Sequence, residues 1–141
     1  QAAIDRAIFA LETGFTSFAT DTSTLTLLDE PDVRERLAPV IDTGAQVMRT
    51  IYTKARELGV EVGHEFEVGD IGKEISTVEE ALTAYRELKE SLTDLSARLS
   101  IDFTQQPLFD VIALQLGTSH GYDFNPDDTL KPYEGGIITE E

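Results

Sequence analysis

Residues 76–99 read STVEEALTAYRELKESLTDLSARL and carry the clearest structural signal in the chain. Apolar side chains recur there at intervals of three or four residues: Val78, Ala81, Tyr85, Leu88, Leu92, Leu95 and Leu99, with Leu82 widening the stripe. This spacing predicts one long amphipathic helix. Ser76 with Glu79, and Thr77 with Glu80, are two candidate capping boxes at its start. Because the stripe is wide, we expect it to need two helical neighbours or a partner chain.

The same spacing predicts three more helices. They span residues 2–20, residues 31–58 and, in a segment that is apolar on nearly all sides, residues 107–117. Gly59 is suited to end the second of these. Pro39 predicts that this helix either kinks or divides into a short and a long helix.

After Gly59 the apolar residues alternate with a period of two, which predicts a half-buried strand over residues 60–68. Residues 22–28, where threonines alternate with leucines, predict a short strand or an extended linker. The predicted fold is mainly α: a three- to four-helix bundle with a minor β element (a strand or hairpin around 60–68) and a long C-terminal arm. Residues 1–117 form the helical domain, and residues 118–141 form an extended acidic C-terminal arm.

Net charge excludes one class of partner. The chain has 11 Lys and Arg against 27 Asp and Glu, which gives a net charge of −16. The basic residues are not clustered, so binding of nucleic acid through a basic patch is excluded. Many acidic residues and few lysines resemble proteins of salt-loving organisms, in which concentrated salt screens the self-repulsion. The alternative is an ordinary acidic bacterial or viral protein.

Three further features of the sequence bear on the class of protein and on its location. The sequence has no cysteine, so it has neither disulfides nor thiolate metal sites. No apolar run reaches the length of roughly 18 residues that a membrane-spanning helix needs. The first residue is Gln1, so we expect a processed chain or a fragment of a longer product. A soluble protein of a halophilic cytoplasm or of a virion is the expectation.

The two histidines offer little for catalysis. His64 falls on the apolar face of the predicted strand, which favours a buried, hydrogen-bonded side chain over a functional one. His120 follows Ser119 in a loop flanked by glycines, where adjacent residues rarely reach the geometry of a catalytic triad. Pairs of carboxylates are too common in this chain to indicate acid–base catalysis.

One acidic segment is a candidate metal site, made of Asp123, Asn125, Asp127 and Glu134. Counted from Asp123, these oxygens stand at positions one, three, five and twelve, the spacing with which an EF-hand loop binds calcium. Asp128 occupies the place of the glycine that the EF-hand turn needs. The alternative is an acidic loop of Asx turns stiffened by proline. Calcium is the one cofactor that the sequence suggests.

The C-terminal arm supplies the candidate interface residues, which are Tyr122, Phe124, Tyr133, Ile137 and Ile138. Its aromatic side chains can anchor on a neighbouring subunit. The segment Gly136–Thr139 can add a strand to a sheet edge, either in the same subunit or in a neighbour.

These features predict a protein that is not an enzyme. We expect a structural or assembly subunit of a homo-oligomeric complex, for example a virion connector, neck or shell component, adapted to high salt. Its partners are then further copies of itself and other assembly proteins. The alternative is a helical-bundle ligand-binding or sensory domain, cut from a larger and membrane-anchored protein. A third hypothesis is a small enzyme that uses carboxylates and a divalent cation held by the Asp123 loop.

Overall fold

The computed structural model describes residues 2–68, 76–99 and 110–114 of the chain. In chain order, the elements are α1 (Ala2–Glu12), β1 (Ser17–Asp21), the 3₁₀ helix η1 (Ser23–Leu25), α2 (Val33–Leu58), β2 (Gly63–Val68), α3 (Val78–Ser91), α4 (Thr93–Leu99) and β3 (Val111–Leu114). Within the described ranges, no helix is both long enough and apolar enough to cross a membrane.

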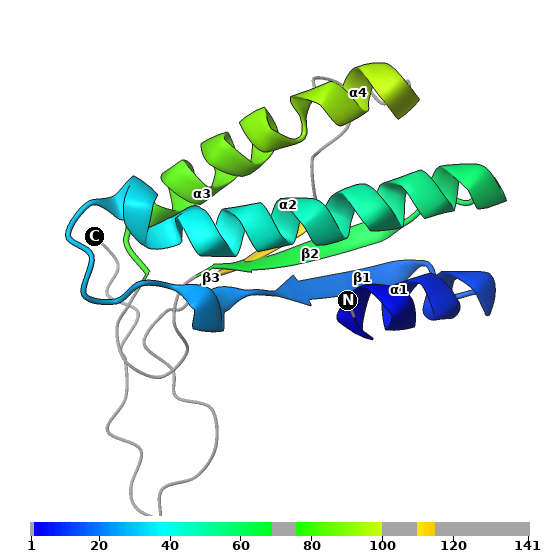
Figure 1. The fold of residues 1–141 in the computed structure, drawn as a ribbon, viewed down its shortest axis with the longest axis horizontal. Helices are drawn as coiled ribbons and strands as arrows, with labels where there is room; N and C mark the ends of the chain where they lie inside the picture. Colours follow the sequence, from blue (N-terminus) through cyan, green and yellow to red (C-terminus); the bar gives the residue numbers. More distant parts are fainter. Residues whose placement is uncertain (1, 69–75, 100–109, 115–141) are drawn as a thin grey trace, which may run out of the picture.

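The three strands form one parallel sheet in the order β1-β2-β3 (Figure 1). Ala19 of β1, Glu65 of β2 and Val111 of β3 lie opposite one another in its register. Figure 1 shows α1, α2 and α3 side by side along the sheet, with α2 between the other two. The described residues therefore form an α/β arrangement, because parallel neighbouring strands need crossover connections, here α2 between β1 and β2 and α3 with α4 between β2 and β3.

The strand predicted over residues 60–68 is present as β2 and is the central strand of the sheet. His64, Phe66 and Val68 are buried, whereas the intervening Glu65 and Glu67 are half-buried. The alternation in the sequence thus separates a core-facing side of the sheet from a polar side.

The ends of α2 follow local sequence signals. Asp32 is the N-cap, and its Oδ1 accepts a hydrogen bond from Glu35 N at 3.0 Å. Gly59 ends the helix with a φ of 69°, in the left-handed region that glycine adopts without strain. α2 is a single helix that contains Pro39, so the alternative of two separate helices is wrong.

The capping box that forms at the start of α3 is the second of the two candidates. Thr77 Oγ1 accepts from Glu80 N at 3.1 Å, and Glu80 Oε2 accepts from Thr77 N at 2.8 Å. The single helix predicted to Leu99 is divided at Leu92 into α3 and α4. Thr93 Oγ1 donates to the backbone oxygen of Lys89 at 3.0 Å, and such hydroxyl contacts compete with regular helical bonding.

The predicted helix over residues 2–20 is wrong beyond Glu12, because the chain turns there and continues as β1. Gly14 has a φ of 100°, and its N–H donates to the oxygen of Leu11 at 3.0 Å. Phe15 N–H donates to the oxygen of Ala10, also at 3.0 Å. This pair of bonds is the Schellman arrangement, which ends a helix and satisfies its last carbonyls.

The strand alternative for residues 22–28 is also wrong, because η1 lies there. Asp21 Oδ1 accepts from both the N–H and the hydroxyl of Ser23, at 2.9 and 2.6 Å. Thr22 Oγ1 donates to the backbone oxygen of Val40 at 3.0 Å, which fixes the segment to α2. Local side-chain bonds of this kind favour turns over sheet pairing.

The helix predicted over residues 107–117 is wrong at residues 111–114, which form β3. A short apolar run fits a buried strand as well as a buried helix, so periodicity alone does not distinguish them. Val111 and Ile112 are β-branched and favour the strand, and Ile112 lies opposite Phe66 in the register.

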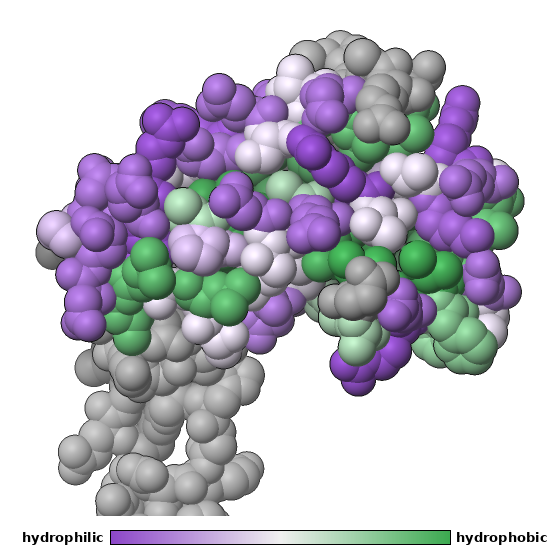
Figure 2. All heavy atoms as spheres, viewed as in Figure 1, coloured by the Kyte–Doolittle hydropathy of each residue, from purple (hydrophilic) through white to green (hydrophobic). Residues whose placement is uncertain are grey.

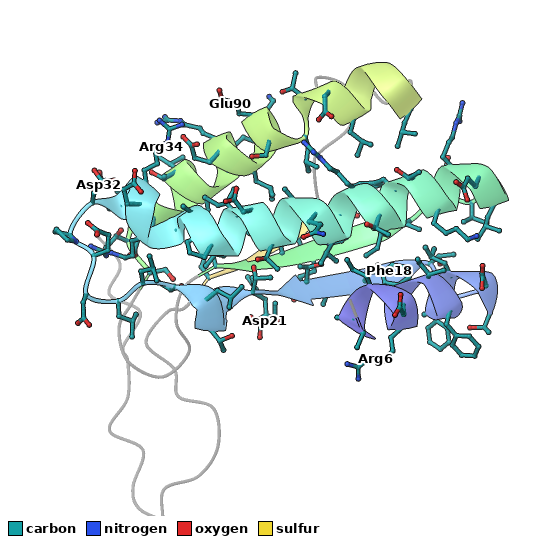
Figure 3. All side chains as sticks on the ribbon, viewed as in Figure 1. Arg6, Phe18, Asp21, Asp32, Arg34 and Glu90 are labelled. Atoms are coloured by element: carbon teal, nitrogen blue, oxygen red, sulfur yellow. The ribbon has the colours of Figure 1, made fainter. Side chains whose placement is uncertain are left out.

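The main core lies between α2, α3, α4 and the sheet. Its buried members are Leu37, Val40, Ile41, Ala45, Met48, Phe66, Val68, Ala84, Leu88, Leu92 and Leu95. A smaller cluster joins α1 to α2 through Leu11, Ile51 and Ala55, and Phe18 packs against it from β1 (Figure 3).

The coarse prediction of a largely helical chain with a strand near 60–68 is confirmed, and the sheet is larger than the minor β element predicted. Residues 118–141 lie outside the described residues. The arm, and the division of the chain at residue 117, therefore stay predictions.

Candidate functional site

All the site residues predicted from the sequence lie outside the described residues. They are the metal candidates Asp123, Asn125, Asp127 and Glu134, and the interface candidates Tyr122, Phe124, Tyr133, Ile137 and Ile138. Calcium binding and docking of the arm therefore stay predictions. Among the residues that the structure does describe, no group of three or more His, Asp or Glu is placed to hold a metal ion.

His64 is the most enclosed titratable side chain in the described core, with an exposed fraction of 2%. Its Nε2 lies 2.7 Å from Thr20 Oγ1 of β1. Its ring centroid lies 5.9 Å from that of Tyr52 of α2. The backbone N–H of His64 donates to Asp110 Oδ2 at 2.7 Å. The side chain thus links β1, β2 and α2 inside the core, and the burial that the sequence predicted for His64 is confirmed.

Burial controls the charge state of this cluster. It lowers the pKa of His64 to about 4, against the opposing influence of the Asp110 carboxylate. Burial of the Tyr52 side chain and, to a smaller extent, the negative charge of Asp110 raise the pKa of Tyr52 to about 12. His64 is therefore neutral at pH 7, and its buried Nδ1 has no hydrogen-bond partner. Because Thr20 is also buried, neither side chain is accessible to a substrate, and the cluster is structural.

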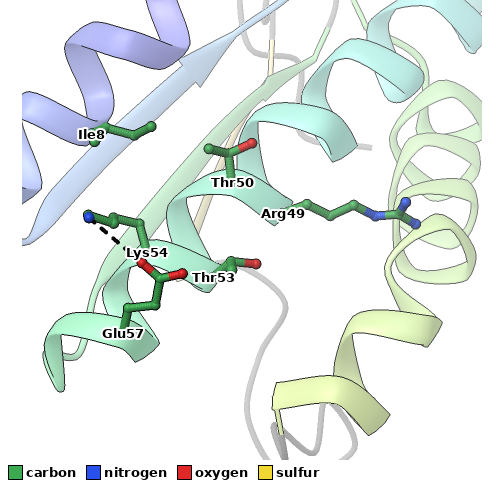
Figure 4. Close-up of a pocket in the computed structure, with 6 residues that line it drawn as sticks. All are labelled: Ile8, Arg49, Thr50, Thr53, Lys54 and Glu57. Carbon is green, nitrogen blue, oxygen red and sulfur yellow. Dashed lines mark ion pairs between the residues drawn. The ribbon is translucent and has the colours of Figure 1, made fainter.

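A hollow of about 410 Å³ lies beside α2 and is lined by Ile8, Arg49, Thr50, Thr53, Lys54 and Glu57 (Figure 4). Its two cations are already paired. Lys54 Nζ lies 3.0 Å from Glu12 Oε1 and 3.7 Å from Glu57 Oε2. Arg49 Nη2 lies 2.7 Å from Asp94 Oδ1 and also donates to the backbone oxygen of Ser91. These ion pairs leave no free positive charge on the hollow to attract an anionic ligand.

Among the described residues, several large apolar side chains are exposed. Eight of them fall into three groups: Phe9 and Phe15 at the end of α1; Leu25, Leu27 and Leu28 in and after η1; and Val78, Leu82 and Tyr85 on α3. Figure 2 shows apolar surface over η1 with the loop that follows it, and over the end of the molecule formed by α1. Such groups, on an otherwise charged surface, are the described features best suited to contact another protein.

The sequence pattern assigns several of these residues to the core. Phe15 belongs to the stripe of the first predicted helix, and Val78, Leu82 and Tyr85 belong to the stripe of the third. For Val78, Leu82 and Tyr85, the sequence signal that indicates exposure is the width of the apolar stripe. One neighbouring helix cannot cover a stripe this wide. For Phe15 the signal is Gly14, which ends α1 before the stripe continues.

No protein-family model matches the chain, and no curated protein or solved structure matches it.

Proposed function

We propose that this chain is a non-enzymatic structural subunit that associates with further copies of itself in an assembly adapted to high salt. Examples of such a subunit are the components of a virion connector, neck or shell. The observation that carries the proposal is the exposure of large apolar side chains in groups on a chain of net charge −16.

Single exposed apolar residues are ordinary on protein surfaces, but groups of them mark contact sites. Phe9 and Phe15 have exposed fractions of 67% and 65%. Aromatic side chains of this kind supply much of the binding energy in protein interfaces. A high negative charge keeps such a chain soluble, and salt screens the repulsion between copies when they meet.

The proposal includes the predicted arm and the helical body. Residues 118–141 form the C-terminal arm that reaches neighbouring subunits, and the helices form the three- to four-helix body that fixes each subunit in place. Deleting residues 118–141 is expected to abolish assembly and to leave the helical signal of the monomer intact. Loss of the helical signal would show instead that this segment belongs to the subunit's own core.

A sensory domain or a carboxylate enzyme gains no support from the described residues. The buried pair of Thr20 and His64 lacks access to solvent, and the hollow beside α2 has its cations paired. A ligand-binding domain needs a concave site with unpaired polar groups that converge on it.

The test of the proposal is the native mass of the unmodified chain in molar salt, measured by light scattering after size exclusion. The proposed function predicts a defined mass that is a multiple of the subunit mass of 15.5 kDa. A monomer at every salt and protein concentration would contradict it.

A further inference from the structure

The apolar residues of α3 lie on two different faces of that helix. Ala84 and Leu88 are buried in the core, and Leu92 continues the same buried side beyond the end of the helix. Val78, Leu82 and Tyr85 have exposed fractions of 76%, 46% and 38%. Their spacing of four and three residues places them on one side of the helix, which we term the outer face of α3.

Two ion pairs show which side of α3 faces α2. Arg36 Nη1 lies 2.9 Å from Glu80 Oε1, and Arg34 Nη2 lies 2.9 Å from Glu87 Oε2. Figure 3 shows Arg34 near the start of α2, at its junction with α3. Glu80 and Glu87 thus point toward α2.

The outer face points away from α2. Val78, Leu82 and Tyr85 each stand two positions away from Glu80, Ala84 or Glu87, and two residues correspond to about 200° around a helix. Figure 1 shows that α3 lies at one end of the row of α1, α2 and α3, on the side of α2 opposite α1. A further helix placed against the outer face would therefore extend this layer of helices.

The charges beside the outer face are self-complementary. Glu79 lies in the first turn of α3 and Arg86 seven residues later, and both are exposed. Seven residues span about 10 Å along a helix, so these two side chains do not pair within one chain. When a second α3 lies antiparallel across a two-fold axis near Leu82, each Glu79 faces the Arg86 of the other copy.

We propose that the outer face of α3 binds the same face of a second copy of this chain, with the two α3 helices antiparallel. Val78, Leu82 and Tyr85 form the apolar centre of this contact, and the two pairs of Glu79 with Arg86 fix its direction. The Tyr85 ring is held beside Lys89, whose Nζ lies 5.8 Å from the ring centroid. This interface rests on the proposed self-association and specifies where it occurs.

The edge of the described sheet also exposes an apolar side chain. β3 is the strand at one end of the described sheet, and the chain reaches it from β2 through α3 and α4. Val111 of β3 has an exposed fraction of 50%. Val111 is therefore a second exposed apolar position, on a different element from the outer face of α3.

Charge reversal tests both the surface and the direction. Glu79→Arg places two arginines together in both pairs of a symmetric dimer, and Arg86→Glu places two glutamates together. Each variant alone is expected to raise the dissociation constant by on the order of tenfold, because attraction becomes repulsion at two positions. A 1:1 mixture of the two variants is expected to recover association, because both pairs of the mixed dimer join opposite charges. The arginine introduced at position 79 of one copy faces the glutamate introduced at position 86 of the other, and the unchanged Arg86 of the first copy faces the unchanged Glu79 of the second. The double variant, in which both pairs carry opposite charges again, is expected to associate as tightly as the unmodified protein.

The measurement is sedimentation equilibrium in about 0.15 M salt, where surface charges still act over about 8 Å. Asp42→Arg is the matched control, because Asp42 is exposed on α2 and its replacement changes the net charge by the same amount as Glu79→Arg. Circular dichroism checks the fold, since an arginine in the first turn of α3 opposes the helix dipole. If a reversal lowers the helical signal, Glu79→Gln and Arg86→Gln replace the pair, and each is expected to weaken association by a smaller factor.

The outcomes separate this interface from the proposed function. An unmodified chain that stays monomeric at about 0.15 M salt and at every higher salt concentration overturns both. An unmodified chain that associates only in molar salt overturns the charge-directed α3 interface alone. If the unmodified chain associates, and the charge-reversed variants associate no more weakly than Asp42→Arg, the α3 interface alone is overturned. Reversals that weaken association without recovery in the double variant overturn the antiparallel pairing.

Discussion

Gly44 of α2 faces the ring of Phe66 of β2 so closely that a Cβ atom on residue 44 would lie 2.5 Å from Phe66 Cε2. Phe66 is fully buried in the centre of the sheet, so its ring has little room to move. The missing side chain at Gly44 therefore sets how closely α2 approaches the sheet.

Gly44→Ala is expected to lower the free energy of unfolding by about 1–3 kcal/mol, because overpacking outweighs the gain in helix propensity. Urea unfolding followed by circular dichroism measures the change. Gln46→Ala, at an exposed position of α2, is the control and is expected to be neutral or slightly stabilising. A Gly44→Ala variant as stable as the parent would contradict the close packing of Phe66 on Gly44.

His64 gives the fold a specific dependence on pH. Its pKa is about 4 in the folded protein and about 6.5 when exposed, so the unfolded chain binds the extra proton between these values. Stability from this group is therefore complete above about pH 6.5 and is lost as the pH falls toward 4. The loss is about 3 kcal/mol at most.

The measurement is the free energy of unfolding from pH 7 to pH 4, in the parent and in His64→Gln. The difference between the two curves isolates His64 from the many carboxylates. We expect the parent to lose more stability than the variant over this range. Parallel curves would show that His64 is not buried in its neutral form.

The capping box of α3 contributes to stability through Thr77 Oγ1. Thr77→Ala is expected to cost about 1 kcal/mol, since it leaves the N–H of Glu80 without its partner. Thr77→Ser keeps the oxygen and is expected to be about as stable as the parent, because serine is at least as good an N-cap residue as threonine. Thermal or urea unfolding of the three proteins compares them, and equal stability of all three would count against the cap.

Salt is expected to stabilise the chain. A net charge of −16 produces self-repulsion in the folded state that is stronger than in the expanded unfolded state. The melting temperature should rise as salt increases from low to molar concentration, because screening reduces this repulsion. A melting temperature independent of salt would contradict the adaptation to high salt.

Local signals predicted the elements that depend on nearby residues. The alternation around His64 predicted β2, Gly59 marked the end of α2, and Thr77 with Glu80 marked the start of α3. Each of these features involves contacts within a few residues, which a sequence pattern contains directly.

The remaining strands depend on distant partners. Phe18 fits the helical stripe that begins at Ile4, and only the turn at Gly14 together with pairing to β2 makes β1 a strand. Val111–Leu114 is apolar enough for a helix or a strand, and pairing with residues 65–68 decides between them. Parallel pairing of this kind leaves no local mark in the sequence, because a long crossover separates the strands.

The exposed face of α3 could be predicted from the sequence only in part, because its exposure also depends on distant parts of the chain. The spacing of Val78, Leu82 and Tyr85 marks them as apolar helix positions, but the number of helices available to cover them is a property of the whole fold.

The central claim is that copies of this chain associate through exposed apolar surface, and its most direct test removes one side chain of that surface. The measurement is the native mass, by light scattering in molar salt, of the unmodified chain and of Leu82→Glu at equal concentration. We predict a multiple of 15.5 kDa for the unmodified chain and a lower mass for the variant, with an unchanged helical signal. A mass of 15.5 kDa for both proteins would contradict the account.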